Sequence, residues 1–465
     1  MCANSRRWGA LLMLIVTAIL AYGSYWLVLI SPSYSMELEN AYEPCKYAAI
    51  IAISGWIAWA ILALSPQRGD NFLIPGALFL TSVSWLEIYS LGFRNPLYSS
   101  QGPRQAISVA VALLLMLLTI LLLRNYRLLE EYKYLFLSGG VIAQLAVMIF
   151  GAAANGARLW FNIGGFSLQP GEFTKICFII FFAAYLRQFS PWMSLGITFG
   201  KESRLSRKAL LILGLSMAVA ELVLVAQRDL GAALLLFGIF IAMFFIATGR
   251  ADIVAITALL SSGGAYACWK FFDHVQVRVA NWLDPFADIG NNGYQMCLAL
   301  FCLNNSGFDG AGLGMGYSEV IPEVSNDFAF VAITEDFGMI GCTALILGII
   351  ILVERCFAVA MRAQDQFGVL LASGLASLFA WQSAIIMLGD TKIIPMTGIT
   401  LPFVSAGGSS LASSFIILGI IWAIDSSNAK AYTSGLSSKA GNSQGQLQSE
   451  SQSDKVKIDS AENEE

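Results

Sequence analysis

Residues 230–249 read Leu-Gly-Ala-Ala-Leu-Leu-Leu-Phe-Gly-Ile-Phe-Ile-Ala-Met-Phe-Phe-Ile-Ala-Thr-Gly, a stretch without a single charged side chain. A helix needs about 20 apolar residues to cross the hydrocarbon core of a bilayer. After a short turn at Arg250 and Ala251, a second apolar run covers 252–270. The pair predicts a tight hairpin of two membrane-spanning helices, and it decides the fold class.

The composition of the whole chain agrees with that hairpin. Apolar residues make up 57% of the sequence and charged residues 12%, with a mean hydropathy of +0.68. A soluble domain has about 25% charged residues. We therefore predict an all-α polytopic membrane protein of about twelve transmembrane helices, with no role in nucleic-acid binding. The other spans fall near 8–30, 47–65, 72–93, 106–124, 134–154, 172–189, 209–226, 329–353, 367–388 and 411–425.

The distribution of Lys and Arg predicts the orientation. Basic residues gather in the short loops of one side, as at Lys201, Arg204, Arg207 and Lys208. Such loops are cytoplasmic by the positive-inside rule. Both termini are then inside, and the large loop at about 272–326 and the segment at about 389–410 are extracytoplasmic. Arg94 and Arg104 fall on the outer side, against the rule.

The last residues have a different character. From 428 to 465, Ser, Gly, Gln, Lys, Asp and Glu dominate. A segment so poor in apolar residues cannot bury enough surface to fold. We predict a disordered cytoplasmic tail, either a docking segment or a solubilising end.

The large outer loop contains the strongest candidate for a functional site. The glycine-rich run Gly310-Ala-Gly-Leu-Gly-Met-Gly316 is followed by Glu319, Glu323 and Asp327. Ionisable groups at a membrane boundary are costly and therefore suggest function. Asp327 directly precedes an apolar run, where partial desolvation would raise its pKa and make it a usable base. The alternative is a carboxylate that caps the following helix.

Three other outer segments are rich in turn-forming and polar residues. Arg158 and Trp160 lie in a Gly-rich loop; Trp160 belongs either to the aromatic belt of the interface or to a lipid-headgroup site. Glu172 and Lys175 are three residues apart at a helix start and can pair. Residues 227–231 contain Arg228 and Asp229, which fit a salt-bridged turn. The segment 395–410 is too broken for a helix, and such backbone is tolerated at membrane depth only when it is buried or lines a cavity.

The cysteines and the single histidine exclude several kinds of site. The eight cysteines show no metal-binding spacing. Cys297 and Cys302 share the outer loop and either form a disulfide or serve as apolar residues of a short helix. With His274 as the one histidine, no His-based triad or zinc site can be built.

These outer segments together resemble those of the SEDS family, the RodA, FtsW and SpoVE group of bacterial cell-wall polymerases. The similarity covers roughly residues 110–425. Its motifs are 166–175, 227–231, 321–328 with Glu335 and Gly338, and 397–405 with 407–410. It implies a ten-helix core at 71–427, preceded by two additional helices within 1–70.

The resemblance also implies an activity. Members polymerise lipid II into glycan strands at the outer face of the cytoplasmic membrane, for elongation or division. They act with a class B penicillin-binding protein, a transpeptidase, and with other elongation or division proteins. The essential aspartate of the family falls on Asp327. The other residues implied to bind substrate are Arg158, Trp160, Glu172, Lys175, Arg228, Asp229, Glu319, Glu323, Lys392, Thr397 and Ser405.

The chemistry of the reaction fits one carboxylate. An inverting transfer deprotonates a sugar 4-hydroxyl as it attacks the anomeric carbon of a pyrophosphate-linked sugar, so Asp327 is the expected base. Arg158, Arg228 and Lys392 are candidates to neutralise pyrophosphate. Glu319 and Glu323 are candidate ligands for a divalent cation such as Mg²⁺. The sequence departs from the family at Ser325-Asn326 and at Ala406. A flippase for lipid-linked precursors and a structural scaffold are the alternative functions.

Overall fold

The computed structural model describes residues 2–31, 42–65, 69–154, 157–163, 166–194 and 201–429. Within these ranges, 12 helices are long and apolar enough to cross a membrane. They coincide with the twelve predicted spans, so the all-α polytopic prediction is confirmed. The predicted tail at 428–465 lies outside the described residues except for 428 and 429, which end the last helix.

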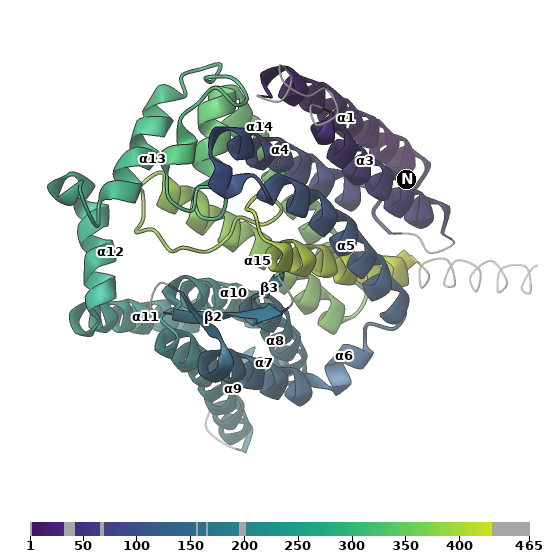
Figure 1. Ribbon diagram of the computed structural model, residues 1–465. Helices are drawn as coiled ribbons and strands as arrows, with labels where there is room; N and C mark the ends of the chain where they lie inside the picture. Colours follow the sequence, from purple (N-terminus) through teal and green to yellow (C-terminus); the bar gives the residue numbers. More distant parts are fainter. Residues whose placement is uncertain are drawn as a thin grey trace, which may run out of the picture.

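The amino-terminal helices form one group. It contains α1 (Cys2–Ile30), α3 (Glu43–Leu64), α4 (Leu73–Arg94) and α5 (Gln101–Leu122), with the short 3-10 helix η2 (Pro96–Tyr98) between the last two. α1 and α3 pack on each other and on α4, and α3 and α4 pack on α5. Figure 1 shows this group on one side of the molecule. The two helices before residue 71 are therefore packed onto the core.

A second group follows in sequence. After the short α6 (Leu128–Glu131) it comprises α7 (Lys133–Phe150), α8 (Pro170–Ser194), α9 (Lys201–Ala226), α10 (Leu230–Thr248) and α11 (Ala251–Phe271). Gly249 ends α10 in the left-handed conformation (φ 66°), which glycine adopts without a Cβ clash. α11 begins at residue 251, which confirms the predicted tight hairpin.

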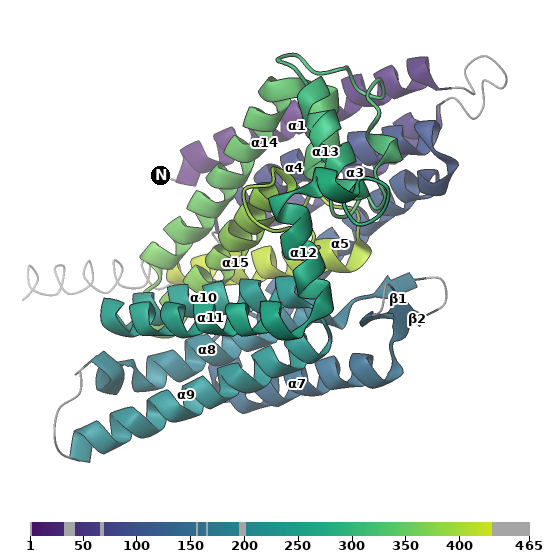
Figure 2. The same cartoon turned by 90° about the vertical axis from the view of Figure 1, so that its left-hand side faces the viewer.

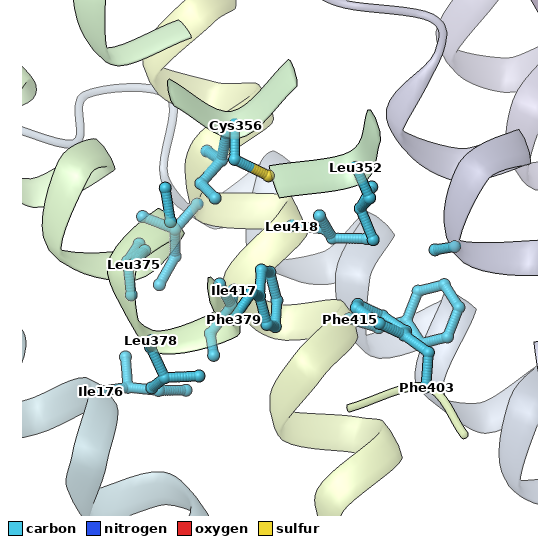
Figure 3. Close-up of a cluster of buried hydrophobic side chains, with 14 of the residues drawn as sticks. Ile176, Leu352, Cys356, Leu375, Leu378, Phe379, Phe403, Phe415, Ile417 and Leu418 are labelled. Carbon is cyan, nitrogen blue, oxygen red and sulfur yellow. The ribbon is translucent and has the colours of Figure 1, made fainter. Parts of the chain in front are cut away.

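Three long helices join the two groups. α14 (Ala329–Arg362) packs on α4, and α15 (Gln366–Asp390) packs on α14, α8 and α10. The final helix covers Gly408–Ala429, and most residues of its apolar stretch are buried inside the molecule. Figure 3 shows side chains of α14, α15 and this last helix meeting in one buried cluster, with Phe379, Phe403 and Phe415 at its centre. This core packs α14, α15 and the last helix against one another.

Connections of substantial length gather at one end of the bundle, called here the loop-rich end. They include an antiparallel sheet of β1 (Ala152–Ala154), β2 (Ala157–Ile163) and β3 (Phe166–Leu168), in the order β1-β2-β3. They also include α12 (Asp273–Leu283), η3 (Pro285–Asp288), α13 (Tyr294–Asn305) and η4 (Ser318–Val320). Figures 1 and 2 show α12 bridging from α11 toward α13 and α14. α12 therefore connects the two helix groups at the loop-rich end.

Candidate active site

Asp327 lies at the entrance to α14. The helix begins at Ala329 with Phe328 as its N-cap residue, and no side chain caps it. The backbone N–H of Asp327 donates to the carbonyl of Glu323 (3.0 Å), which closes a turn before the helix. The alternative prediction, that Asp327 is a helix cap, is therefore wrong. Its carboxylate is left available for other contacts.

The Asp327 side chain lines a narrow pocket. The walls come from the end of α15 and the segment after it, with a second carboxyl, that of Asp390, in the lining. Burial raises the pKa of Asp327 to about 6; the charge of Glu323 adds to the rise and Arg278 opposes it. Asp327 is thus a base that is mostly ionised at neutral pH and readily protonated in mild acid. The full lining is Asp327, Ile386, Gly389, Asp390, Met396, Thr397, Gly398 and Ile399.

Ser405 holds the loop that carries Asp327. Its hydroxyl donates to the carbonyl of Asn326 (2.5 Å) and accepts from the backbone N–H of Leu401 (2.8 Å). One residue on, the N–H of Ala406 donates to the carbonyl of Ser325 (2.7 Å). Ser405 was predicted to bind substrate. That role stays a prediction; the hydrogen bonds of the hydroxyl also hold the loop that carries Asp327.

α12 lies against the same pocket. Arg278 donates from Nη1 to the carbonyl of Thr397 (3.1 Å), and the indole N–H of Trp282 donates to the carbonyl of Lys392 (3.2 Å). A Cβ built on Gly398 would lie 3.8 Å from Arg278 Nη2 and 3.9 Å from Asp327 Oδ2. The guanidinium and the carboxylate therefore face each other across Gly398. Thr397 and Lys392 contribute backbone carbonyls to this arrangement.

A buried polar network joins α8 to its neighbours. Lys175 pairs with Glu172 (2.9 Å), as predicted from their spacing, and also contacts Oε1 of Gln382 (3.2 Å). Ser413 donates to the other oxygen of Glu172 (3.2 Å). Asp229 caps α10 by accepting from the N–H of Ala232 (3.0 Å), and burial raises its pKa. No ion pair joins Arg228 to Asp229 in the described residues, so the predicted salt-bridged turn is wrong.

Glu319 belongs to a different cluster. Arg94, at the end of α4, contacts Glu87 (2.9 Å), Glu319 (3.3 Å) and Asp336 (3.2 Å). The Glu319 side chain is 18% exposed, and the Asp336 side chain is fully buried. The carboxylate partners compensate the charge of this mostly buried guanidinium at the loop-rich end. We name Glu87, Arg94, Glu319 and Asp336 the Arg94 cluster.

The glycine-rich run wraps around the start of α14. The N–H groups of Gly314 (2.7 Å) and Gly316 (3.1 Å) donate to Asp336, and that of Tyr317 donates to Glu335 (3.1 Å). At Gly338 the helix breaks, with φ 65° and ψ −165°, a conformation essentially restricted to glycine. These contacts fix the loop that ends at Asp327. The glycines therefore allow the backbone of this run to lie close to α14.

Other predicted site residues lie farther into solvent. Arg158 on β2 is exposed and donates to the carbonyl of Ile149 (3.1 Å), while Trp160, two residues on, is partly buried. Arg228 is exposed and has a positive φ of 63°. Each lies in a connection at the loop-rich end, but within the described part of the chain none of them forms a hydrogen bond or ion pair with Asp327.

The residues present do not fit a divalent cation held jointly by Glu319 and Glu323. Glu319 contacts Arg94, whereas Glu323 accepts from the amide of Asn326 (2.8 Å). The described residues contain no group of three or more His, Cys, Asp or Glu side chains arranged for a metal ion. Cys297 and Cys302 are both free and buried on α13, so the disulfide alternative is wrong and the apolar-helix alternative holds.

A second cavity lies between α9, α10 and α11. Its volume is ≈ 720 Å³, and apolar side chains dominate its lining. Glu221 is the single charged residue in that lining, and its Oε1 has no partner among the described residues. The cavity suits an apolar chain rather than an acid–base reaction.

Two residues in or beside the Asp327 pocket, Asp390 in its lining and Arg278 next to it, were missed in the sequence. Asp390 reads as the polar end of a span, and Arg278 reads as an ordinary outer-loop cation. The contact between the segments 272–283 and 390–400 could not be predicted from the sequence, because the two segments are over a hundred residues apart. Pro395 and Gly398 indicate turns after Asp390, but the sequence does not indicate which residues those turns contact.

Comparison with known proteins places this arrangement in a family. The family model for FtsW, RodA and SpoVE, described as cell cycle protein, matches residues 71–430. The peptidoglycan glycosyltransferase RodA of Mycobacterium tuberculosis is 32% identical over 431 residues, covering 90% of each chain. The probable peptidoglycan glycosyltransferase FtsW of Geobacter metallireducens is 30% identical over 76% of this chain and 94% of its own.

Solved structures show the same fold. One chain, from a peptidoglycan synthase complex described as coordinating polymerization and crosslinking, has a TM-score of 0.63 at 24% identity, covering 78% of this chain and 98% of that one. The rod shape determining protein RodA of Thermus thermophilus gives a TM-score of 0.54 at 22% identity, covering 77% and 97%. With a family model matching most of its length and relatives above 30% identity, the chain belongs to the FtsW, RodA and SpoVE family of multi-pass membrane proteins.

Proposed function

We propose that this chain, a peptidoglycan glycosyltransferase as its named relatives are, polymerises lipid II into glycan strands at the outer face of the cytoplasmic membrane. The observation that carries the proposal is the Asp327 carboxylate, held at a helix entrance with a pKa raised by burial to about 6. A base with that pKa accepts a proton efficiently near neutral pH.

In the proposed reaction, Asp327 removes the proton of the acceptor sugar's 4-hydroxyl as that oxygen attacks the anomeric carbon of the donor. The bond from that carbon to the pyrophosphate oxygen breaks, and the lipid pyrophosphate leaves with the electron pair. Attack from the opposite side inverts the configuration. The leaving group needs charge stabilisation more than protonation.

Arg278 is the cation that the geometry favours for contact with the leaving pyrophosphate. Its Nη2 faces Asp327 across Gly398, and Nη1 is held by the Thr397 carbonyl. Arg158, Arg228 and Lys392 remain candidates for the more distant parts of the substrate. The apolar cavity between α9, α10 and α11 is a proposed place for the lipid tail.

The proposal extends to partners and orientation. A solved neighbour belongs to a complex described as coordinating polymerization and crosslinking. That likeness supports a class B penicillin-binding protein as the transpeptidase partner here, alongside other elongation or division proteins. We also propose cytoplasmic termini, two accessory helices before residue 71, a polymerase core at 71–427 and a disordered tail at 428–465.

The test replaces Asp327 by Asn in the full-length chain, supplied with lipid II and a cognate transpeptidase. The amide keeps the shape but cannot accept the proton, so polymerisation should fall by at least about 10²-fold. Asp309→Asn is the matched control, because Asp309 is an exposed aspartate of the same outer loop. Membrane insertion and partner binding should stay normal in both variants.

Wild-type levels of polymer from Asp327→Asn would rule out this base. A flippase would instead translocate lipid II across vesicles without producing polymer from the wild-type chain. A scaffold would let Asp327→Asn support growth as well as the Asp309 control does.

A further inference from the structure

Asp390 is a buried carboxyl in the Asp327 pocket. It is the last residue of α15, it is 2% exposed, and its Oδ2 has no hydrogen-bond partner among the described residues. Asp327 lines the same narrow pocket. A carboxyl without a partner in so small a space is costly if it is ionised.

Two negative charges in this pocket would be poorly compensated. Arg278 is the cation that faces it, and one of its Nη groups is already bonded to the Thr397 carbonyl. Like charges that share a confined site cannot both ionise easily, so one of the two carboxyls keeps a proton.

The surroundings decide which carboxyl keeps it. Asp327 is partly exposed, faces Arg278 and precedes the amino-terminal end of α14, where the helix dipole favours an anion. Asp390 is the last residue of α15, where the dipole disfavours an anion, and its free oxygen has no donor. The proton therefore belongs on Asp390.

Other charged groups near α15 do not change this assignment. Glu323 lies on the loop before α14 and adds negative charge, while Lys392 follows Asp390 by two residues. α15 has no further charged residue between 366 and 389. The charged groups of the packed helices have partners of their own: Glu172 and Lys175 on α8, Asp229 before α10, and Glu335 and Asp336 on α14.

We propose that Asp390 acts as a neutral carboxylic acid, a positioning residue that donates a hydrogen bond into the pocket beside the base. This inference rests on the proposed function. A neutral Asp390 leaves Asp327 as the one anion of the pair and adds no repulsion toward an anionic pyrophosphate. Its O–H can donate to the carboxylate of Asp327, which it would hold in place for the reaction.

The test compares two variants of the full-length chain in lipid II polymerisation across pH. Asp390→Asn keeps a neutral donor of the same shape, so activity at pH 7 should stay within about three-fold of wild type. Asp390→Leu removes the donor and should lose about ten-fold or more, the size of one preorganised hydrogen bond. The wild-type profile should fall at alkaline pH as Asp390 ionises, and Asp390→Asn should lack that fall.

Infrared spectroscopy supplies a readout that does not depend on activity. A neutral Asp390 contributes the C=O stretch of a protonated carboxylic acid at neutral pH, and this band should be absent from Asp390→Asn. Asp327→Asn should retain the band. Thermal unfolding of each variant checks that the fold is kept.

Two results would overturn the inference. One is an Asp390→Asn variant as inactive as Asp327→Asn while wild type polymerises lipid II. The other is an infrared difference spectrum, wild type minus Asp390→Asn at neutral pH, that contains no protonated-carboxyl band. Lack of polymer from wild type would count against the proposed function instead, and the infrared band would still decide the state of Asp390.

Discussion

The Arg94 cluster and the Asp327 pocket both place carboxylates and an arginine at the loop-rich end, yet they differ in how completely those groups are paired. Arg94 contacts three carboxylates at once, and backbone N–H groups bind Asp336 from the other side. Arg278 faces Asp327 across a gap, and Asp390 keeps a free oxygen.

The difference separates structure from chemistry. A charge that is held by several ion-pair partners stabilises one conformation and has little left to offer a substrate. A charge that is buried but incompletely paired has an altered pKa and is able to react. By this criterion we expect a structural role for Glu319, which contacts Arg94, although it stands only eight residues before Asp327.

The largest expected effect is on the Arg94 cluster. Arg94→Leu leaves Glu87, Glu319 and Asp336 without their shared cation, and breaking a buried ion pair costs about 3–5 kcal/mol of unfolding free energy. Denaturant unfolding in detergent micelles measures the change. Arg104→Leu is the matched control, since Arg104 is exposed on the same side and should shift stability by no more than about 0.5 kcal/mol. Equal stability of the two variants would mean that the cluster has no structural role.

The second effect is a shift in pH dependence at the Asp327 pocket. The base works when ionised, so polymerisation should fall about ten-fold per unit below a pH of about 6. This fall in rate on the acid side is the acid limb of the pH profile. The charge of Glu323 raises the pKa of Asp327, so Glu323→Gln should move the acid limb to lower pH. Arg278 lowers that pKa, so Arg278→Leu should move the limb to higher pH.

Glu319→Gln serves as the control for these two variants. Its carboxylate belongs to the Arg94 cluster, so the acid limb should keep its position even where yield or stability declines. If the acid limb moved as much with Glu319→Gln as with Glu323→Gln, the proposed difference in role between the Arg94 cluster and the Asp327 pocket would be wrong.

The smallest effect concerns the hydroxyl that joins the pocket to the 397–405 segment. Ser405→Ala removes two hydrogen bonds and should cost about 1 kcal/mol or slightly more in stability. Because the loop carrying Asp327 loosens, the turnover number should fall several-fold while the lipid II concentration for half-maximal rate changes little. Ser99→Ala, at an exposed turn on the same side, is the comparison. A change confined to substrate affinity would return Ser405 to the predicted binding role.

Much of the fold was predictable from the sequence because bilayer thickness sets the length of each apolar run. The twelve spans, the Gly249 turn and the Glu172–Lys175 pair all depend on residues close in sequence. Asp327 was predicted as the site carboxylate for the same reason, since a carboxylate directly before an apolar run is a local signal, and its role stays a prediction.

The rest depended on contacts between distant segments. Arg94 meets Asp336 across 242 positions, and Arg278 meets Thr397 across 119. No local pattern distinguishes Glu319, which binds an arginine, from Glu323, which acts on Asp327. The acidic residues of the loop could be predicted as a group, but their division into structural and chemical roles required the tertiary structure.

Gly310 and Gly338 set a limit on how this protein can vary. A methyl group on Gly310 would lie 2.3 Å from the carbonyl oxygen of Asp336, and one on Gly338 would lie 2.3 Å from the nitrogen of Gly310. Both obstacles are backbone atoms, so shrinking a neighbouring side chain cannot relieve them. A substitution at either position has no compensating partner elsewhere in the chain, which makes the two glycines a joint constraint on evolution and on engineering of the outer loop.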